Sequence, residues 1–513
     1  MFAIALLGAL VLLLLWGRIN RFTSSPYRKL PLPPGPRSLP FVGNALHLPK
    51  LLPWREYAQW SKEYGDVIFL RAFSQPIVIL NSLEAVDDLL ERRSSNNSDR
   101  LTVEMIELSG WGWNPGLMRY GTRWRRHRRS FHQLMNQNAV AKYEPYHYEA
   151  ARRLLRLLYH EPTEFARHLR YVFGATSLEV AYGIQVAEKD DPLTASAERA
   201  LAAGSEYIPS WFPGGGFKIK ANSFMLLERV SCLEGEAYAQ EEEIAKNLSA
   251  AVYAVFVPGG IDTTVTVVHC FFLAMVLYPQ VQMRAQEELA RVVGVERLPR
   301  FEDRPYLHYI NALCKECLRW QPVLPLGVAH RSISDDEYRG FHIPAGSVLL
   351  QNLWAILHDP KAYPDPEEFR PERFLKNGEL DLSVRDPAVA AFGAGRRICP
   401  GRYFSDMSLF MTVASILQVF NITPPVESQG QPVKIEPKMT TGTFSLALFR
   451  DINGTFAHAA LLADILKPSN ALSNRVLTRR SIVWDDVAMQ PSTGEVVIPY
   501  LTNKNVGLAS IIK

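Results

Sequence analysis

The stretch AAFGAGRRICPGRYF, residues 390–404, decides the fold of this 513-residue chain. It surrounds Cys399 with glycines and arginines, and it places Phe392 seven residues before the cysteine and Gly401 two residues after it. A cysteine that only packs in a core needs no such surroundings. A thiolate is a soft ligand suited to iron, and it stays deprotonated only where positive charge and backbone N–H groups face it. The stretch therefore predicts a thiolate on an exposed loop that is rich in hydrogen-bond donors.

The other residues of this loop indicate what the thiolate would bind. Gly393, Gly395 and Gly401 allow backbone amides to approach the sulfur closely, and they leave room for a flat cofactor. Arg397, two residues from the cysteine, can pair with a carboxylate of that cofactor. Haem meets each of these requirements, so Cys399 is the predicted metal ligand.

Length, charge and cysteine content exclude several classes of protein. A chain of 513 residues can bury a large core, and its net charge of +4 is too small to indicate a nucleic-acid partner. The five cysteines are odd in number and scattered, which favours a reducing compartment over a disulfide framework. Cys314 and Cys317 form a CxxC inside a helical pattern, where residues i and i+3 share a face. We therefore expect them in the core, not in a redox pair or half a zinc site.

The N-terminus predicts a membrane anchor. Residues 1–17 carry no charge, and Arg18 and Arg21 follow at once. The run is near the lower limit of roughly 17 residues for spanning a bilayer. A cleaved signal peptide would have positive charge before the run and a small-x-small cleavage site after it, and neither is present. We expect a single transmembrane helix over 1–17 with the downstream chain in the cytosol, followed by a basic and proline-rich hinge over 18–40.

Periodicity in the rest of the chain predicts a mainly α protein with small β-sheets, organised as one large domain. The helical patterns are RWRRHRRSFHQLM, AVYAVFVPGGIDTTVTVVHCFFLAMVLY, PQVQMRAQEELARVV and YLHYINALCKECLRWQ, and the strand-like runs are DVIFLRAF, PIVILN and SVLLQNLWA.

The cysteine loop resembles the haem-binding loop of the cytochrome P-450 haem-thiolate monooxygenases. Its residues Phe392, Gly395, Arg397, Cys399 and Gly401 match the F-x-x-G-x-R-x-C-x-G motif of that family. The resemblance covers residues 32–443, and the expected P-450 domain is 41–443. It implies thiolate-ligated haem b as cofactor, and it implies oxidation by O2 with electrons from an NADPH-dependent flavoprotein reductase.

Two further motifs extend the resemblance. Glu316 and Arg319 match the family's E-x-x-R, and PERF at 371–374 matches a second motif that contains Arg373. A lone ExxR is usually a surface ion pair. The resemblance implies instead that the three charges support the segment that carries Cys399.

The apolar helix and the basic helix hold the remaining matches. GGIDTT, residues 259–264, is similar to the family's oxygen-activation motif, which implies that Asp262 and Thr263 are catalytic and take part in proton delivery. The alternative is a helix kink, which Pro258 alone would explain; Pro258 is also a departure from the family pattern.

Trp124 and Arg128 match W-x-x-x-R, which implies partners for a haem propionate. His330 aligns with a third such partner.

Partners and substrate follow from the same resemblance. Arg125, Arg126 and Arg129 belong to a dense basic cluster, which is either a solvated face or the docking surface for the reductase. Segments such as PSWFPGGGFK and YRGFHIPAGS are similar to fungal membrane-bound members of secondary metabolism. This implies the endoplasmic reticulum membrane and a small hydrophobic substrate, either terpenoid or aromatic and indolic.

Two departures leave alternatives open. The chain is shorter than these relatives between residue 191 and the GGIDTT motif, where the family roofs its substrate pocket, and the segment 444–513 matches no family pattern. A non-catalytic haem-binding relative with a compressed lid is therefore the second hypothesis. A peroxygenase or isomerase on the same scaffold and a membrane protein without haem are further alternatives.

Overall fold

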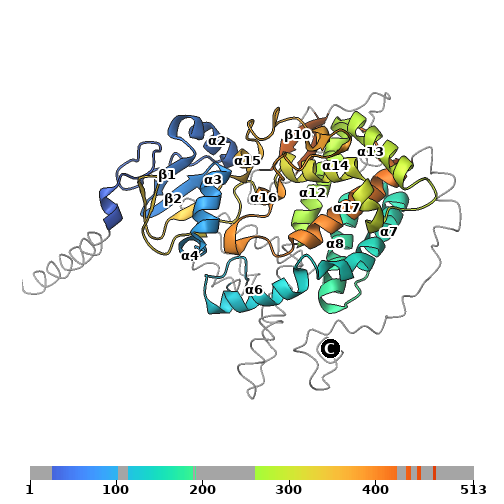
Figure 1. Cartoon of the computed structure of the whole chain (residues 1–513), viewed down its shortest axis with the longest axis horizontal. Helices are drawn as coiled ribbons and strands as arrows, with labels where there is room; N and C mark the ends of the chain where they lie inside the picture. Colours follow the sequence, from blue (N-terminus) through green and yellow to red (C-terminus); the bar gives the residue numbers. More distant parts are fainter. Residues whose placement is uncertain are drawn as a thin grey trace, which may run out of the picture.

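The computed structural model of the chain describes residues 26–101, 112, 114–188, 191, 260–424, 435–440, 447–451 and 466–468. The expected anchor over 1–17, most of the shortened region that starts at residue 191 and most of the segment 444–513 lie outside the described residues. Figure 1 shows a small sheet with α2 and α3 at one end of the molecule and a group of long helices at the other. The sequence prediction of a mainly helical protein with small sheets is confirmed.

Helices account for most of the described chain. The longer ones are α2 (Pro53–Tyr64), α6 (Thr122–Met135), α7 (Glu144–His160), α8 (Phe165–Tyr182), α12 (Ile261–Leu277), α13 (Pro279–Val292), α14 (His308–Trp320) and α17 (Arg402–Val419). The shorter α-helices are α3 (Leu83–Val86), α4 (Ser94–Asn97), α15 (Leu353–Leu357) and α16 (Ala388–Ala391). A π-helix, η2 (Asp87–Arg92), continues α3, and 3-10 turns include η1 (Pro26–Lys29), η3 (Val140–Tyr143), η4 (Pro162–Glu164), η8 (Phe301–Tyr306), η9 (Pro371–Phe374) and η10 (Gly395–Arg397).

The main core lies between α7, α8, α12, α13, α14 and α17. Helix α12 is apolar around almost its whole circumference, so it is stable only where other helices enclose it. Most of α17 is buried in the same way, from Met407 to Val419. Because α17 begins directly after the cysteine loop, the core fixes the position of that loop.

The largest sheet has four strands in the order β1-β2-β6-β3. Its strands are β1 (Val67–Ala72), β2 (Gln75–Leu80), β6 (Val348–Gln351) and β3 (His330–Arg331). β1 and β2 form an antiparallel hairpin with Val67 opposite Leu80, and β6 pairs with β2 in parallel. Four two-stranded sheets are made by β4 (Asp336–Tyr338) with β5 (Phe341–Ile343), β7 (Leu375–Lys376) with β8 (Glu379–Leu380), β9 (Phe420–Ile422) with β12 (Leu466–Pro468), and β10 (Ile435–Met439) with β11 (Ala447–Asp451).

One strand expectation is wrong in its second half. The run SVLLQNLWA was expected to be extended, but β6 ends at Gln351 and α15 starts two residues later. The cause is Asn352, whose side-chain oxygen accepts a hydrogen bond from the backbone N–H of Ala355 at 3.2 Å and so caps the helix.

The described part of the expected hinge contacts two strands, β1 and β5. The backbone N–H of Phe69 donates to the Pro34 carbonyl at 2.9 Å, and that of His342 donates to the Pro31 carbonyl at 2.8 Å. A Cβ on Gly35 would lie only 2.1 Å from the Phe69 carbonyl oxygen. Residues 31–36 therefore have a fixed course, held by β5 at Pro31 and by β1 at Pro34.

Two strands of the C-terminal segment pair with strands of the domain. β11 and β12 belong to the segment 444–513, and each pairs with an earlier strand, so these parts of the segment join the domain.

Cys314 and Cys317 are free thiols in the main core, and burial raises the pKa of Cys314 to about 12. Their expected place in the core is confirmed.

Among the described residues, no single helix has both the length and the apolar composition needed to cross a membrane. Only α12 and α13 taken together pass that test, and they are bent by 105° at the break between them.

Candidate functional site

The cysteine loop is a tight turn between α16 and α17. The backbone N–H of Cys399 donates to the Phe392 carbonyl at 2.8 Å, which closes the loop. Gly393 and Gly395 have φ angles of +75° and +64°, a region that bulky residues rarely adopt. The loop therefore holds the cysteine at the start of α17, between Phe392 and Gly401.

The surroundings of the Cys399 sulfur combine opposing effects. Burial raises the pKa of the thiol, whereas the backbone N–H of Gly401 and the guanidinium groups of Arg128 and Arg402 lower it. Burial is the largest of these effects, and Cys399 is partly buried, so it is less exposed than the sequence suggested. The donors that would stabilise a thiolate are present, and a cation bound to the sulfur would supply the remaining stabilisation.

The π-helix η2 supports the cysteine loop, and the sequence did not predict this contact. A Cβ on Gly395 would lie 1.9 Å from the carbonyl oxygen of Leu90, so only glycine allows the two backbones to approach this closely. The backbone N–H of Gly395 also donates to a carboxylate oxygen of Glu91 at 2.9 Å. Single π turns are rare and occur often at functional sites, but no residue pattern in DDLLER announces one.

Beside the loop lies a group of buried cationic side chains. Arg397 donates from Nε to the Ser98 carbonyl at 2.8 Å and from Nη2 to the Met118 carbonyl at 2.7 Å. Its guanidinium carbon lies 4.4 Å from the ring centre of Trp124, which is a cation–π contact. Burial lowers the pKa of Arg397 to about 10.

Arg100 is the second member of this group, and it was missing from the sequence prediction. Its Nη1 donates to the carbonyls of Val328 and Ala329, both at 2.7 Å. Burial and the charge of Arg397 hold the pKa of Arg100 well below its usual value. The only sequence signal was an arginine inside the polar run SSNNSDR, which is not distinctive.

The charge of these two guanidiniums is incompletely balanced within the described residues. Asp99 is the nearby carboxylate, but it also pairs with Arg119 at 3.2 Å and accepts a hydrogen bond from the Tyr120 backbone at 2.8 Å. A guanidinium has five N–H groups, and the described contacts use three of them in each arginine. The remaining donors and the excess positive charge fit the carboxylates of an anionic cofactor such as haem.

His330, on β3, lies beside these two arginines. Its Nδ1 lies 2.8 Å from the Asn97 carbonyl oxygen, so this nitrogen carries the proton. Burial, Arg100 and Arg397 hold the pKa of His330 well below its usual value, so the ring is neutral. A neutral His330 cannot donate a second hydrogen bond to a carboxylate, and a nearby anion would favour its protonated form.

Helix α6 contributes residues to the site on one side and to the exposed surface on the other. Trp124 is buried against Arg397, and Arg128 is placed where it acts electrostatically on the Cys399 sulfur. Arg125, Arg126 and Arg129 are exposed on the other side of the helix. The helix thus connects a basic surface to the cysteine loop.

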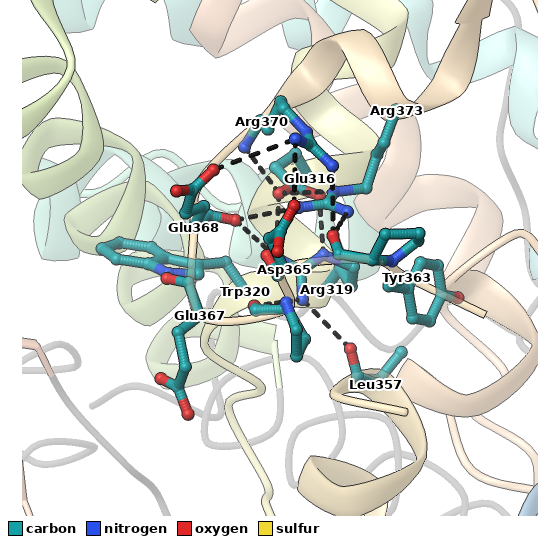
Figure 2. A network of polar contacts seen from close by, with 12 residues as sticks. Glu316, Arg319, Trp320, Leu357, Tyr363, Asp365, Glu367, Glu368, Arg370 and Arg373 are labelled. Atoms are coloured by element: carbon teal, nitrogen blue, oxygen red, sulfur yellow. Dashed lines mark hydrogen bonds and ion pairs between the residues drawn. The ribbon is translucent and has the colours of Figure 1, made fainter. Parts of the chain in front are cut away.

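Glu316, Arg319 and Arg373 meet in a buried network (Figure 2). The Glu316 carboxylate accepts from Arg319 at 2.7 and 2.8 Å and from Arg373 Nε at 3.1 Å. Glu316 and Arg319 are fully buried, and the Arg373 side chain is 3% exposed. The remaining guanidinium donors reach backbone carbonyls of Leu357, Pro364, Asp365, Pro366 and Glu368. The network joins α14 to the segment that leads towards the cysteine loop.

Asp262 and Thr263 lie in the first turn of α12, while Pro258 and Gly259 lie outside the described residues. The Asp262 carboxylate faces α8, where Arg170 Nη1 lies 2.9 Å from Oδ1 without the alignment of a hydrogen bond. α8 and α12 pack closely here, because a Cβ on Gly174 would lie 3.2 Å from Ile261. Arg170 is a partner of Asp262 that no sequence motif marked.

Comparison with known proteins places this site in context. The family model for cytochrome P450 matches residues 33–211 and 221–446. The chain is 39% identical over 460 residues to the cytochrome P450 monooxygenase COX1 of Coprinopsis cinerea, which is 80% of this chain and 88% of that protein. It is 38% identical over 485 residues to the tryptamine 4-monooxygenase of Psilocybe cyanescens, which is 85% of this chain and 95% of that protein. It is also 38% identical to the monooxygenase ple1 of Rhodocybe pseudopiperita over 84% of this chain and 90% of that protein.

The buried network generates a stability prediction. Changing Glu316 to Ala leaves Arg319 buried without its carboxylate, and we expect a loss of about 3–5 kcal/mol in the free energy of unfolding. The matched control is Arg370→Ala. In the described part of the chain the Arg370 side chain forms ion pairs with two exposed carboxylates and an exposed hydrogen bond to the Pro364 carbonyl, and the alanine keeps the backbone N–H that donates to Glu316, so it should lose about 1 kcal/mol or less. Urea denaturation of the full chain measures both, and equal small losses would contradict the structural role of Glu316.

The approach of η2 to the cysteine loop generates a second prediction. Both Gly393→Ala and Gly395→Ala place a side chain at positive φ, which costs about 1–2 kcal/mol. Only Gly395→Ala also forces a Cβ against Leu90, because nothing lies within 4 Å of a Cβ on Gly393. We expect Gly395→Ala to lose about 3 kcal/mol or more by the same denaturation assay. A loss no larger than that of Gly393→Ala would contradict the contact.

Proposed function

This chain belongs to the cytochrome P450 family and is a P450 monooxygenase, and from this premise we propose that it oxidises a small hydrophobic secondary metabolite with O2. The proposed substrate class is terpenoid or aromatic and indolic. The single observation that carries the proposal is the cysteine loop, in which Gly401, Arg128 and Arg402 face the Cys399 sulfur. The electrons come in this proposal from an NADPH-dependent flavoprotein reductase.

Haem b fits the residues at the site, with Cys399 as its iron ligand. When bound, haem supplies the activation of O2 that the amino acids themselves cannot perform. Arg397, Arg128, Trp124 and, when protonated, His330 would hold its carboxylates. The unbalanced charge of the buried arginines supports this assignment, because a buried cation without an anion is costly.

The loop residues around the cysteine have separate roles in this proposal. Phe392 accepts the Cys399 backbone N–H and closes the loop, and Gly395 lets the loop contact η2. Gly401 donates its N–H to the sulfur, and a Cβ there would meet no protein atom within 4 Å. The open space beside Gly401 and Gly393 is consistent with a flat group next to the loop.

Asp262 and Thr263 are the proposed proton-delivery residues. A carboxylate and a hydroxyl on the first turn of an apolar helix can hold and move a proton. Arg170 would keep the Asp262 carboxylate in place on the side of α8. Glu316, Arg319 and Arg373 are structural supports and touch no reacting atom.

The proposed docking site for the reductase is the exposed basic side of α6, near Arg125, Arg126 and Arg129. These residues are exposed on the helix that also carries Arg128 towards the sulfur. A positive patch steers an acidic partner, and this one would bring it close to the cofactor side of the protein.

The proposed location is the endoplasmic reticulum membrane, with residues 1–17 as a single-pass anchor and the catalytic domain in the cytosol. The support is the uncharged run followed by Arg18, Arg21, Arg28 and Lys29. For the substrate, the support is the tryptamine 4-monooxygenase among the relatives, whose name describes oxidation of an indolic amine by that protein.

The haem-thiolate assignment is tested by the absorption spectrum of the reduced, carbon monoxide-bound chain in membranes. We expect a strongly red-shifted Soret band in the wild type that is lost in Cys399→Ser, because the serine hydroxyl does not replace the thiolate. Oxidation of indolic and terpenoid compounds with added reductase is then measured. A normal band without oxidation of any compound would favour the non-catalytic haem-binding relative, and no band in well-expressed wild type would overturn the proposal.

Asp262 and Arg170 form a pair in which only one member is a proton carrier. Changing Asp262 to Asn should lower turnover about 100-fold, the contribution typical of a general acid, with an unchanged carbon monoxide spectrum. Arg170→Gln breaks the same ion pair but keeps the carboxylate, so it serves as the matched control. It should retain most of the turnover and show a smaller solvent isotope effect than Asp262→Asn. Equal losses in the two variants would assign the pair a structural role only.

A further inference from the structure

Asp99 is a buried carboxylate that belongs to none of the sequence motifs and has no part in the proposed proton delivery. Its side chain is 4% exposed, and it lies directly before Arg100 in the chain. Its Oδ1 accepts a hydrogen bond from the backbone N–H of Tyr120 at 2.8 Å, and its Oδ2 accepts two from Arg119 at 3.2 and 3.3 Å. Because a buried charge is costly even when it is paired, a carboxylate at this position points to a role beyond packing.

The backbone around Asp99 connects three segments of the site. The Asp99 carbonyl accepts a hydrogen bond from the backbone N–H of Arg331 on β3 at 2.8 Å. The neighbouring Ser98 carbonyl accepts from Arg397 Nε of the cysteine loop at 2.8 Å. Tyr120, which bonds to the Asp99 carboxylate, lies two residues before α6. Asp99 is therefore fixed relative to β3, to the cysteine loop and to α6.

The two buried arginines bind the same segment as Asp99, residues 115–120. Arg100 Nε donates to the Gly116 carbonyl at 3.0 Å, and Arg397 Nη2 donates to the Met118 carbonyl at 2.7 Å. Burial lowers the pKa of both arginines, and the negative charge of Asp99 raises it. The charge of Asp99 thus acts on both guanidiniums whose excess positive charge fits the carboxylates of haem.

A second observation indicates that a polar ligand lies beside this segment. Ser98 is fully buried, and its Oγ has no hydrogen-bond partner among the residues that the structure describes. Buried hydroxyl groups nearly always have such a partner. A cofactor carboxylate held by Arg397 would supply it, because Arg397 is bonded to the carbonyl of the same serine. The fixed charge of Asp99 therefore belongs to the residue next to the expected edge of the cofactor.

We propose that Asp99 is a positioning residue that lowers the reduction potential of the haem iron, through a fixed negative charge beside Arg100 and Arg397. The proposal rests on the proposed haem site. The step concerned is the transfer of one electron from the proposed reductase to ferric iron, which gives ferrous iron. A negative charge nearby disfavours the added electron. Arg119 offsets part of the charge of Asp99, and salt screens this offset because the Arg119 side chain is 64% exposed.

The first test compares Asp99→Asn with Asp303→Asn in the purified full chain loaded with haem. Asparagine removes the charge but keeps an oxygen that can accept the Tyr120 N–H. Asp303 is the matched control, because its carboxylate also accepts from one arginine, Arg297, and from one backbone N–H, that of Arg300. Spectroelectrochemical titration measures the midpoint potential of the iron.

We expect Asp99→Asn to shift the midpoint potential to more positive values. The ratio of reduced to oxidised chain at a fixed applied potential should rise about 5-fold, and Asp303→Asn should leave it nearly unchanged. A potential of Asp99→Asn that is unchanged or more negative would overturn the proposal. So would an equal shift in the control.

Arg119→Gln tests whether the effect is one of charge, and it changes an exposed side chain. Removing this partner should shift the midpoint potential to more negative values, opposite in sign to Asp99→Asn. The shift should shrink several-fold between about 0.01 M and about 1 M salt, whereas that of Asp99→Asn should persist. Shifts of the same sign in the two variants would indicate damage to the site and overturn the proposal.

The reduced, carbon monoxide-bound spectrum separates failure of this inference from failure of the proposed function. A wild type without the red-shifted Soret band would overturn both. A normal band in the wild type and in all variants, with an unshifted potential, would overturn only the role of Asp99. If Asp99→Asn does not take up haem, Arg119→Gln decides, because a negative shift supports the proposal and an unchanged potential overturns it.

Discussion

The rest of the structure depends on the buried carboxylate of Glu316. It holds Arg319 on its own helix and Arg373 on a distant turn, and backbone carbonyls take up the remaining donors. Burying three charges carries a desolvation cost that their attraction barely repays, so the network contributes more to specifying one arrangement than to net stability. The arrangement it specifies is the course of residues 357–373 across α14, and this course sets where the chain enters the cysteine loop.

The site itself contains two electrostatic deficits that a single ligand can satisfy. Burial raises the pKa of the partly buried Cys399 thiol, so a cation bound to the sulfur would stabilise its thiolate. Arg100 and Arg397 are buried with too little negative charge around them, so they need an anion. A ligand with a metal ion at its centre and carboxylates at its edge meets both needs at once. Its binding would therefore stabilise the folded chain as well as equip it for chemistry.

The sequence predicted the parts of the fold that depend on residue type and spacing. The apolar run of α12, the amphipathic patterns of α13 and α14 and the glycines around Cys399 all determine local structure directly. It failed where a single contact made far away in the chain decides the outcome. Arg100 becomes part of the site only because the chain at Val328 and Ala329 presents carbonyls to it, and η2 matters only because Leu90 meets Gly395. Neither contact leaves a pattern in the neighbouring residues.

The contact between Arg170 and Asp262 connects the proposed chemistry to the packing of two helices. Arg170 lies on α8 and Asp262 on the first turn of α12. The two helices pack closely at this point, because a Cβ on Gly174 would lie 3.2 Å from the Ile261 side chain. This packing keeps the two charged groups within reach of each other. A restrained Asp262 can take part in catalysis only if its proton reaches the cofactor side while α8 and α12 stay together. Loss of turnover in Asp262→Asn but not in Arg170→Gln would indicate that the carboxylate carries the proton, and equal losses would indicate a structural role for the pair.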